Sequence, residues 1–211
     1  MDLLNDLILQ AAASPWLYLV MLLAAVLDGV FPPVPSETVL VAAAAVAAAA
    51  GGPHLALLCA AAATGAVVGD NLAFALGRTV GTSRWAWMRH PRVAAAFTRA
   101  ATSLDRRGAM LIIGARYIPV GRVAVNMSAG AVGYPWGRFL PLSIVAAVTW
   151  TLFSAAIGLL AGHWATDQPL LSAAIGIAIA LTIGLVIDRV AARRRRHRPT
   201  PLAVLEVDGV K

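Results

Sequence analysis

The first 77 residues contain no lysine or arginine, and the whole chain of 211 residues is only 13% charged. Together with 60% hydrophobic residues, so little charge excludes an ordinary soluble domain. A membrane-spanning helix needs about 20 apolar residues, so this length holds about four to six embedded segments and no separate soluble domain. The sequence therefore predicts an all-α polytopic membrane protein.

Other residue types are also scarce. The single cysteine, Cys59, excludes an internal disulfide. No basic residue precedes the first apolar segment, which argues against a cleaved signal peptide, so we expect that segment to stay in the mature protein. The embedded segments contain no histidine, and the sequence predicts no metal site and no cofactor. The four histidines are scattered over loops and tail: His54, His90, His163 and His197.

Basic residues gather in two places, the connection 78–108 and the tail 189–211. Such residues mark the cytoplasmic side of a membrane protein, so we expect both places to lie inside. The connection alternates apolar and basic residues and contains Trp85 and Trp87, a pattern typical of an amphipathic interfacial helix. The tail run "RRRRHR" indicates attraction to anionic lipid rather than to nucleic acid. We predict one membrane-embedded domain, 1–188, and a basic cytoplasmic tail, 189–211.

Two apolar segments are interrupted. The first, 17–50, is broken by "PPVP", and the second, 109–130, by Pro119 and Gly121. The segments 53–77, 140–161 and 170–187 are uninterrupted spans, and Gly65 and Gly69 have the spacing that suits close helix packing. Broken segments at corresponding positions of two halves indicate a transporter binding site near the middle of the membrane. We therefore predict two opposed re-entrant helical hairpins, the first entering from outside and the second from inside.

The embedded segments carry three acids, Asp28, Glu37 and Asp70, and two bases, Arg116 and Arg122. Each charge costs about 2.5–3.5 kcal/mol at the middle of the bilayer, so the charges must pair or face water. Broken backbone at this depth is tolerated only inside protein or beside a water-filled cavity. We expect acids from the first hairpin and arginines from the second to meet across a polar cavity.

A bend is needed to bring the two arginines into one site. Six residues apart, they lie on different faces of an unbroken helix. Pro119 interrupts the helical hydrogen bonds and Gly121 permits unusual backbone angles, so a bend at "IPVG" would let both guanidinium groups converge. Convergent arginines suit a phosphate, because each guanidinium offers paired donors and stays charged.

The acids have several possible roles. Asp28 and Glu37 can hold the arginines while the site is empty, and burial makes their protonation feasible, which would couple anion binding to proton uptake. The alternative is a static salt bridge of the arginines with Glu37 or Asp28. Asp70 is either functional or only a cap or hydrogen-bonding group for a neighbouring helix. Asn71 and Asn126 are either ligands or donors in helix packing.

Three stretches together resemble the DedA family, also called the SNARE-associated or VTT-domain family. They are "LDGVFPPVPSE", "GAVVGDNLAFALGRTVG" and "RYIPVGRVAVNMSAGAVGYPWGRF", in the family's order and spacing. The resemblance implies two facing re-entrant hairpins and makes Asp28, Glu37, Arg116 and Arg122 the functional residues. Two details depart from the family: the first acid is Asp28-Gly29 rather than Glu-Asn, and the Pro-Gly-acid turn is Pro35-Ser36-Glu37.

The resemblance also implies an activity and a location. It implies a translocase in the bacterial cytoplasmic membrane that returns polyprenyl phosphate, the undecaprenyl or decaprenyl carrier of cell-wall synthesis, across that membrane with protons as partners. A phospholipid scramblase, a proton-coupled carrier of small solutes and a structural membrane protein remain alternatives. A lipid phosphatase would need a nucleophile or a positioned histidine near the arginines, so we expect no enzyme.

Overall fold

The computed structural model describes residues 14–31, 34–50, 53–84 and 90–164, and the regular structure in these ranges is helical throughout. This confirms the predicted all-α class. The predicted span 170–187, the tail 189–211, Trp85 and Trp87 lie outside the described residues. The helices are α2 (Trp16–Val30), α3 (Ser36–Ala50), α4 (Leu55–Val80), α5 (Pro91–Ala115), α6 (Pro119–Ala131) and α7 (Trp136–Trp164).

Two of these helices, α4 and α7, are long and apolar enough to cross a membrane. They correspond to the predicted spans 53–77 and 140–161. Helix α7 begins at Trp136, before the predicted start, and continues through Pro141. Helices α2 and α3 are apolar too, but each has only 15 residues. At about 1.5 Å per residue, each is roughly 22 Å long, shorter than the hydrocarbon core of a bilayer.

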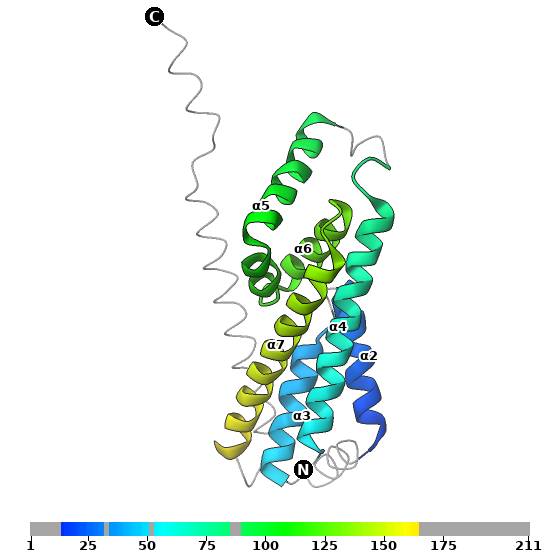
Figure 1. The fold of residues 1–211 in the computed structure, drawn as a ribbon. Coiled ribbons are helices and arrows are strands. Elements are labelled where there is room, and N and C mark those ends of the chain that lie inside the picture. Colours follow the sequence, from blue (N-terminus) through cyan, green and yellow to red (C-terminus); the bar gives the residue numbers. More distant parts are fainter. Residues whose placement is uncertain (1–13, 32–33, 51–52, 85–89, 165–211) are drawn as a thin grey trace, which may run out of the picture.

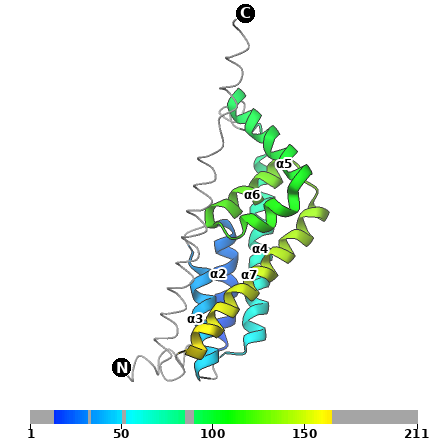
Figure 2. The ribbon, with the colours of Figure 1, turned by 90° about the vertical axis from the view of Figure 1, so that its left-hand side faces the viewer.

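The short helices are arranged around the two long ones in two groups. Helices α2 and α3 lie along one half of the α4 and α7 pair, whereas α5 and α6 lie along the other half (Figures 1 and 2). Helix α2 packs on α4, α3 on α7, and α6 on α4. The two interrupted segments of the sequence therefore meet near the middle of the long helices.

Glycines permit the close approach of these helices. A Cβ atom at Gly29 of α2 would lie 2.5 Å from the backbone carbon of Gly69 on α4, and Gly65 faces the Leu22 carbonyl. Farther along α4, Gly77 lies against the backbone of Met127 on α6. The predicted packing role of Gly65 and Gly69 is confirmed. Small residues at a helix contact let the backbones approach within van der Waals distance.

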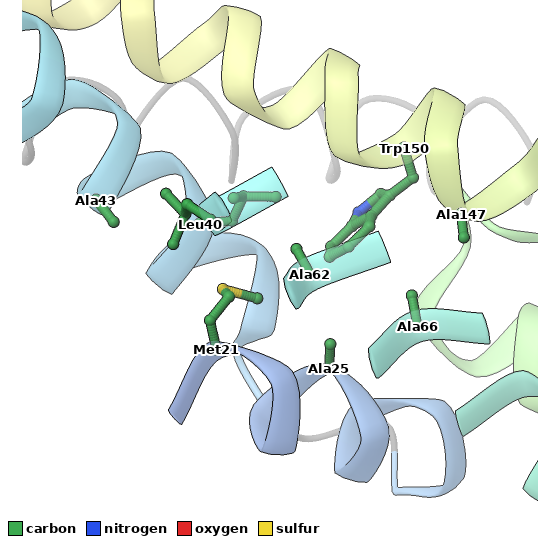
Figure 3. Packing of buried hydrophobic residues seen from close by; sticks show 9 residues of the cluster. Met21, Ala25, Leu40, Ala43, Ala62, Ala66, Ala147 and Trp150 are labelled. Atoms are coloured by element: carbon green, nitrogen blue, oxygen red, sulfur yellow. The ribbon is translucent and has the colours of Figure 1, made fainter. Parts of the chain in front are cut away.

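The main apolar core lies where α2, α3, α4 and α7 meet. Figure 3 shows Trp150 of α7 extending toward Leu40 and Ala62, with Met21 and Ala25 of α2 below. Trp150 is 4% exposed and the other four residues 0–2%. One large ring among alanines fills the space between closely packed backbones.

The bend of the second interrupted segment lies earlier than predicted. The chain turns at residues 116–118, and Pro119 begins α6, so the prediction of a bend at "IPVG" is wrong in position. Proline suits the first helical position, since its missing N–H has no partner there in any case. Gly121 does not have a positive φ; a Cβ atom there would lie 2.9 Å from the side chain of Ile118, so its role is steric.

Helix α5 also differs from the prediction of a separate interfacial helix. It begins in the basic connection at Pro91 and continues into the apolar segment as far as Ala115. The backbone departs from helical geometry inside it only at Arg107, where φ is −143° and ψ is 32°. The amphipathic part and the first arm of the second interrupted segment are therefore one kinked helix.

Candidate functional site

Two buried ion pairs connect the two halves of the chain. An Nη1 atom of Arg116 lies 2.5 Å from Oδ2 of Asp70, and Nη2 of Arg122 lies 2.5 Å from Oδ1 of Asp28. Arg122 also donates to the backbone carbonyl of Asp28 at 2.5 Å. The four residues are 3–7% exposed. The structure thus brings both predicted arginines to acids of the first half, but the partner of Arg116 is Asp70, not Asp28 or Glu37.

Asp70 accepts hydrogen bonds from three different helical elements. Besides Arg116 at the end of α5, Nδ2 of Asn126 on α6 donates to Oδ1 at 3.0 Å, and Oγ of Ser143 on α7 donates to Oδ2 at 3.1 Å. Asp70 thus lies beside the charged arginine and also bonds to neighbouring helices, so the geometry fits both interpretations given for it. Asn126 is its donor. Ser143 was not predicted, because a single serine in an apolar span gives no signal until the helix facing it is known.

Asp28 is held on both carboxylate oxygens. One oxygen pairs with Arg122, and the other accepts a hydrogen bond from Oγ of Ser36, which is fully buried at the start of α3. The departures from the family pattern thus have physical reasons. Gly29 fits the contact with Gly69 of α4, and Ser36 supplies a donor to Asp28 that glycine would lack.

The remaining predicted residues take no part in the two ion pairs. Glu37 is partly buried and lies close to Asp28 and Arg122, but it makes no ion pair or hydrogen bond with the described residues. Asn71 is outside the site: it donates to the Val67 carbonyl of its own helix at 2.8 Å and accepts from Nε1 of Trp136 at 2.8 Å. It therefore has the packing role. Pro35 is exposed and precedes α3, and its carbonyl accepts the N–H of Val39.

The predicted open, polar cavity does not surround the arginines in this structure. Arg116 is 4% exposed and Arg122 is 5% exposed, and each guanidinium lies against a carboxylate of the first half of the chain. Each guanidinium nevertheless keeps a buried Nε–H with no acceptor among the described residues. The guanidinium carbon of Arg116 lies 5.0 Å from the ring centroid of Trp150, within the range of a cation–π contact. The site is closed but retains unused donors.

The family model described as the VTT domain matches residues 34–160. This range contains Glu37, Asp70 and both arginines, and it begins shortly after Asp28. No curated protein and no solved structure matches the chain. Three of the four paired residues, Asp70, Arg116 and Arg122, therefore lie within the matched domain.

Proposed function

The chain belongs to the VTT-domain family, also known as DedA, and from that premise we propose that it is a translocase of lipid phosphates with polyprenyl phosphate as its substrate. The observation that carries the proposal is the pair of buried arginines, each held by one carboxylate and each with a buried Nε–H that has no acceptor among the described residues. Guanidinium groups bind phosphate oxygens through paired charge-assisted hydrogen bonds. A phosphate head can therefore replace the carboxylates as their partner.

In this proposal the two helix pairs are re-entrant hairpins that enter from opposite sides of the membrane. The shortness of α2 and α3 supports this, as does their position along one half of α4 and α7 while α5 and α6 occupy the other half (Figures 1 and 2). The protein lies in a bacterial cytoplasmic membrane with its C-terminus inside. The ion pairs lie where the hairpins meet, at the depth where transporters bind substrates.

In this proposal, the arginines change their binding partners during the transport cycle. In the closed state Asp70 and Asp28 hold them. When the hairpins separate, the phosphate head takes the place of these carboxylates, and its hydrocarbon tail stays in lipid. Glu37 exchanges protons with the aqueous phase, since burial of a carboxylate without a counter-ion favours its neutral form. No covalent bond is made or broken.

Transport of a labelled polyprenyl phosphate in liposomes tests the proposal. Wild-type protein should move the lipid at a rate that responds to a pH gradient, and Arg116→Ala and Arg122→Ala should each abolish movement while the protein remains folded. Arg99→Ala is the matched control, since Arg99 is exposed on α5. Equal movement of neutral lipids would instead indicate a scramblase and would contradict a phosphate site.

The burial of both ion pairs favours one alternative, a structural role in fixing the register of the helices. A buried ion pair can be replaced by neutral groups with little loss of stability when both partners are changed together. The double variant Asp70→Asn/Arg116→Gln separates the two functions. Loss of lipid movement in the folded double variant supports the phosphate site, whereas full activity supports the structural role.

A further inference from the structure

Two buried hydroxyls on α7 are not used by the ion pairs. Oγ1 of Thr151 and Oγ of Ser154 have no hydrogen-bond partner in the part of the chain that the structure describes, and the two residues are 2% and 0% exposed. Hydroxyls in apolar helices often donate to their own backbone, as Thr149 does to the Val145 carbonyl at 2.9 Å. Because buried polar groups seldom lack a partner, the two hydroxyls indicate a further bound group.

The packing of α7 on α3 places Ser154 level with Glu37, and Thr151 about one turn before it. A Cβ atom at Gly158 would lie 2.5 Å from the Val41 carbonyl, and the next α7 glycine, one turn later, lies against a carbonyl one turn later on α3. The two helices therefore run in the same direction and in step. One turn before Gly158 is Ser154, and one turn before Val41 is Glu37. Ser154 and Glu37 thus lie at one level on facing sides, with Thr151 on the same side of α7.

The formal charges in this region do not balance. Asp28 and Asp70 each pair with one arginine, which leaves Glu37 as a third carboxylate. Asp28 and Arg122 are the charged groups that act on Glu37, and Arg122 already pairs with Asp28. Glu37 lies in the first turn of α3, where the helix dipole supplies only about half of an elementary positive charge. Among the described residues, the region is therefore short of positive charge beside two hydroxyl oxygens without a hydrogen-bond partner.

We propose that Glu37, Thr151 and Ser154 form a binding site for a small monovalent cation, Na⁺. Carboxylate and hydroxyl oxygens are hard ligands that favour hard cations over soft transition metals. One carboxylate with two neutral oxygens matches the charge of a monovalent ion better than that of a divalent one. Sodium binding itself does not depend on the proposed function; only a role of the site in transport rests on it. In that role, Na⁺ and a proton compete for the same Glu37 carboxylate.

Sodium binding to the purified full-length protein, without lipid substrate, tests the site. The melting temperature should rise with Na⁺ concentration relative to choline at equal pH and ionic strength, because a ligand that binds only the folded state stabilises it. Radioactive sodium should bind to the same protein. The double variant Thr151→Val/Ser154→Ala should weaken the apparent affinity by at least about tenfold, and Glu37→Gln should abolish the response.

Thr149→Val is the matched control and should respond to Na⁺ like the wild type, since its hydroxyl bonds within its own helix. Equal wild-type melting temperatures in Na⁺ and choline would overturn the site, as would an undiminished response in the double variant. A melting temperature that rises at lower pH but does not respond to Na⁺ would also overturn the site. In that case a proton, not Na⁺, neutralises Glu37. If the double variant does not fold, the response of the melting temperature to Na⁺ is measured in Ser154→Ala instead. Loss of lipid transport in liposomes has no bearing on these outcomes.

Discussion

Asp70 is the residue on which most of the site converges. Donors from the end of α5, from α6 and from α7 all reach its carboxylate, so one side chain of α4 fixes the position of three other elements. If Arg116 leaves for a phosphate, Asn126 and Ser143 still donate to Asp70. The carboxylate is therefore not left bare when the ion pair opens. Among the described residues, Ser36 alone has this role for Asp28.

Asp70→Asn should lower the free energy of unfolding by about 3–5 kcal/mol, because Arg116 would stay buried without a counter-charge. Adding Arg116→Gln should recover part of this loss, since the two residues are in contact and their effects are not additive. Unfolding in mixed detergent measures both. Asp105→Asn, on the exposed surface of α5, is the control and should change little. A single variant as stable as the wild type would show that Arg116 does not depend on this pair.

Backbone contacts at glycines determine how closely the helices approach one another. Helix α2 touches α4 at Gly29 and Gly69, and this contact sets the distance between Asp28 on α2 and the second half of the chain. The geometry of the ion pair therefore depends on residues that carry no functional group.

Gly69→Ala should destabilise the protein by about 1–3 kcal/mol, the usual cost of an overpacked contact, because a Cβ atom there would lie 2.7 Å from the Val26 carbonyl. It should also reduce lipid transport by moving Asp28 away from Arg122. Gly137→Ala is the matched control: nothing lies within 4 Å of its Cβ position in α7. Thermal unfolding and the liposome assay provide the measurements, and equal effects of the two substitutions would contradict the role given to the α2–α4 contact.

Local features made the elements predictable, and distant contacts limited the prediction of the site. Apolar runs and prolines indicated where helices break, whereas the exact turn at 116–118 depended on proline serving as the first residue of α6. The convergence of arginines on acids followed from the cost of isolated charge in lipid. The pairing of Arg116 with Asp70 in particular could not be predicted in this way, because it depends on the contact between two segments 46 residues apart in the sequence. Ser36 and Ser143 were missed for the same reason.

At the scale of the whole molecule, α4 and α7 run in opposite directions past the site (Figure 1), so in the proposed topology the ends of these helices lie on opposite sides of the membrane. The basic connection follows α4, and the exposed His163 lies at the end of α7. The orientation proposed for the protein is therefore testable at the ends of these two helices.

Single cysteines in a Cys59→Ala background should report opposite sides of the membrane. Ser83→Cys, just after α4, should react with an impermeant maleimide only from the cytoplasmic side, and His163→Cys only from outside. Both positions are exposed, so reactivity depends on sidedness rather than on burial. Labelling of intact cells and of inverted vesicles supplies the two readings. Reaction of both positions from one side would refute the assigned topology.

The continuity of α5 has a mechanical consequence. Its first part carries the exposed arginines of the basic connection, and its last residue precedes Arg116 directly. The kink at Arg107 separates these two parts, so a displacement of the first part reaches Arg116 only through the bend at that residue. A change of the angle at this bend would alter the position of the Arg116 guanidinium relative to the Asp70 carboxylate.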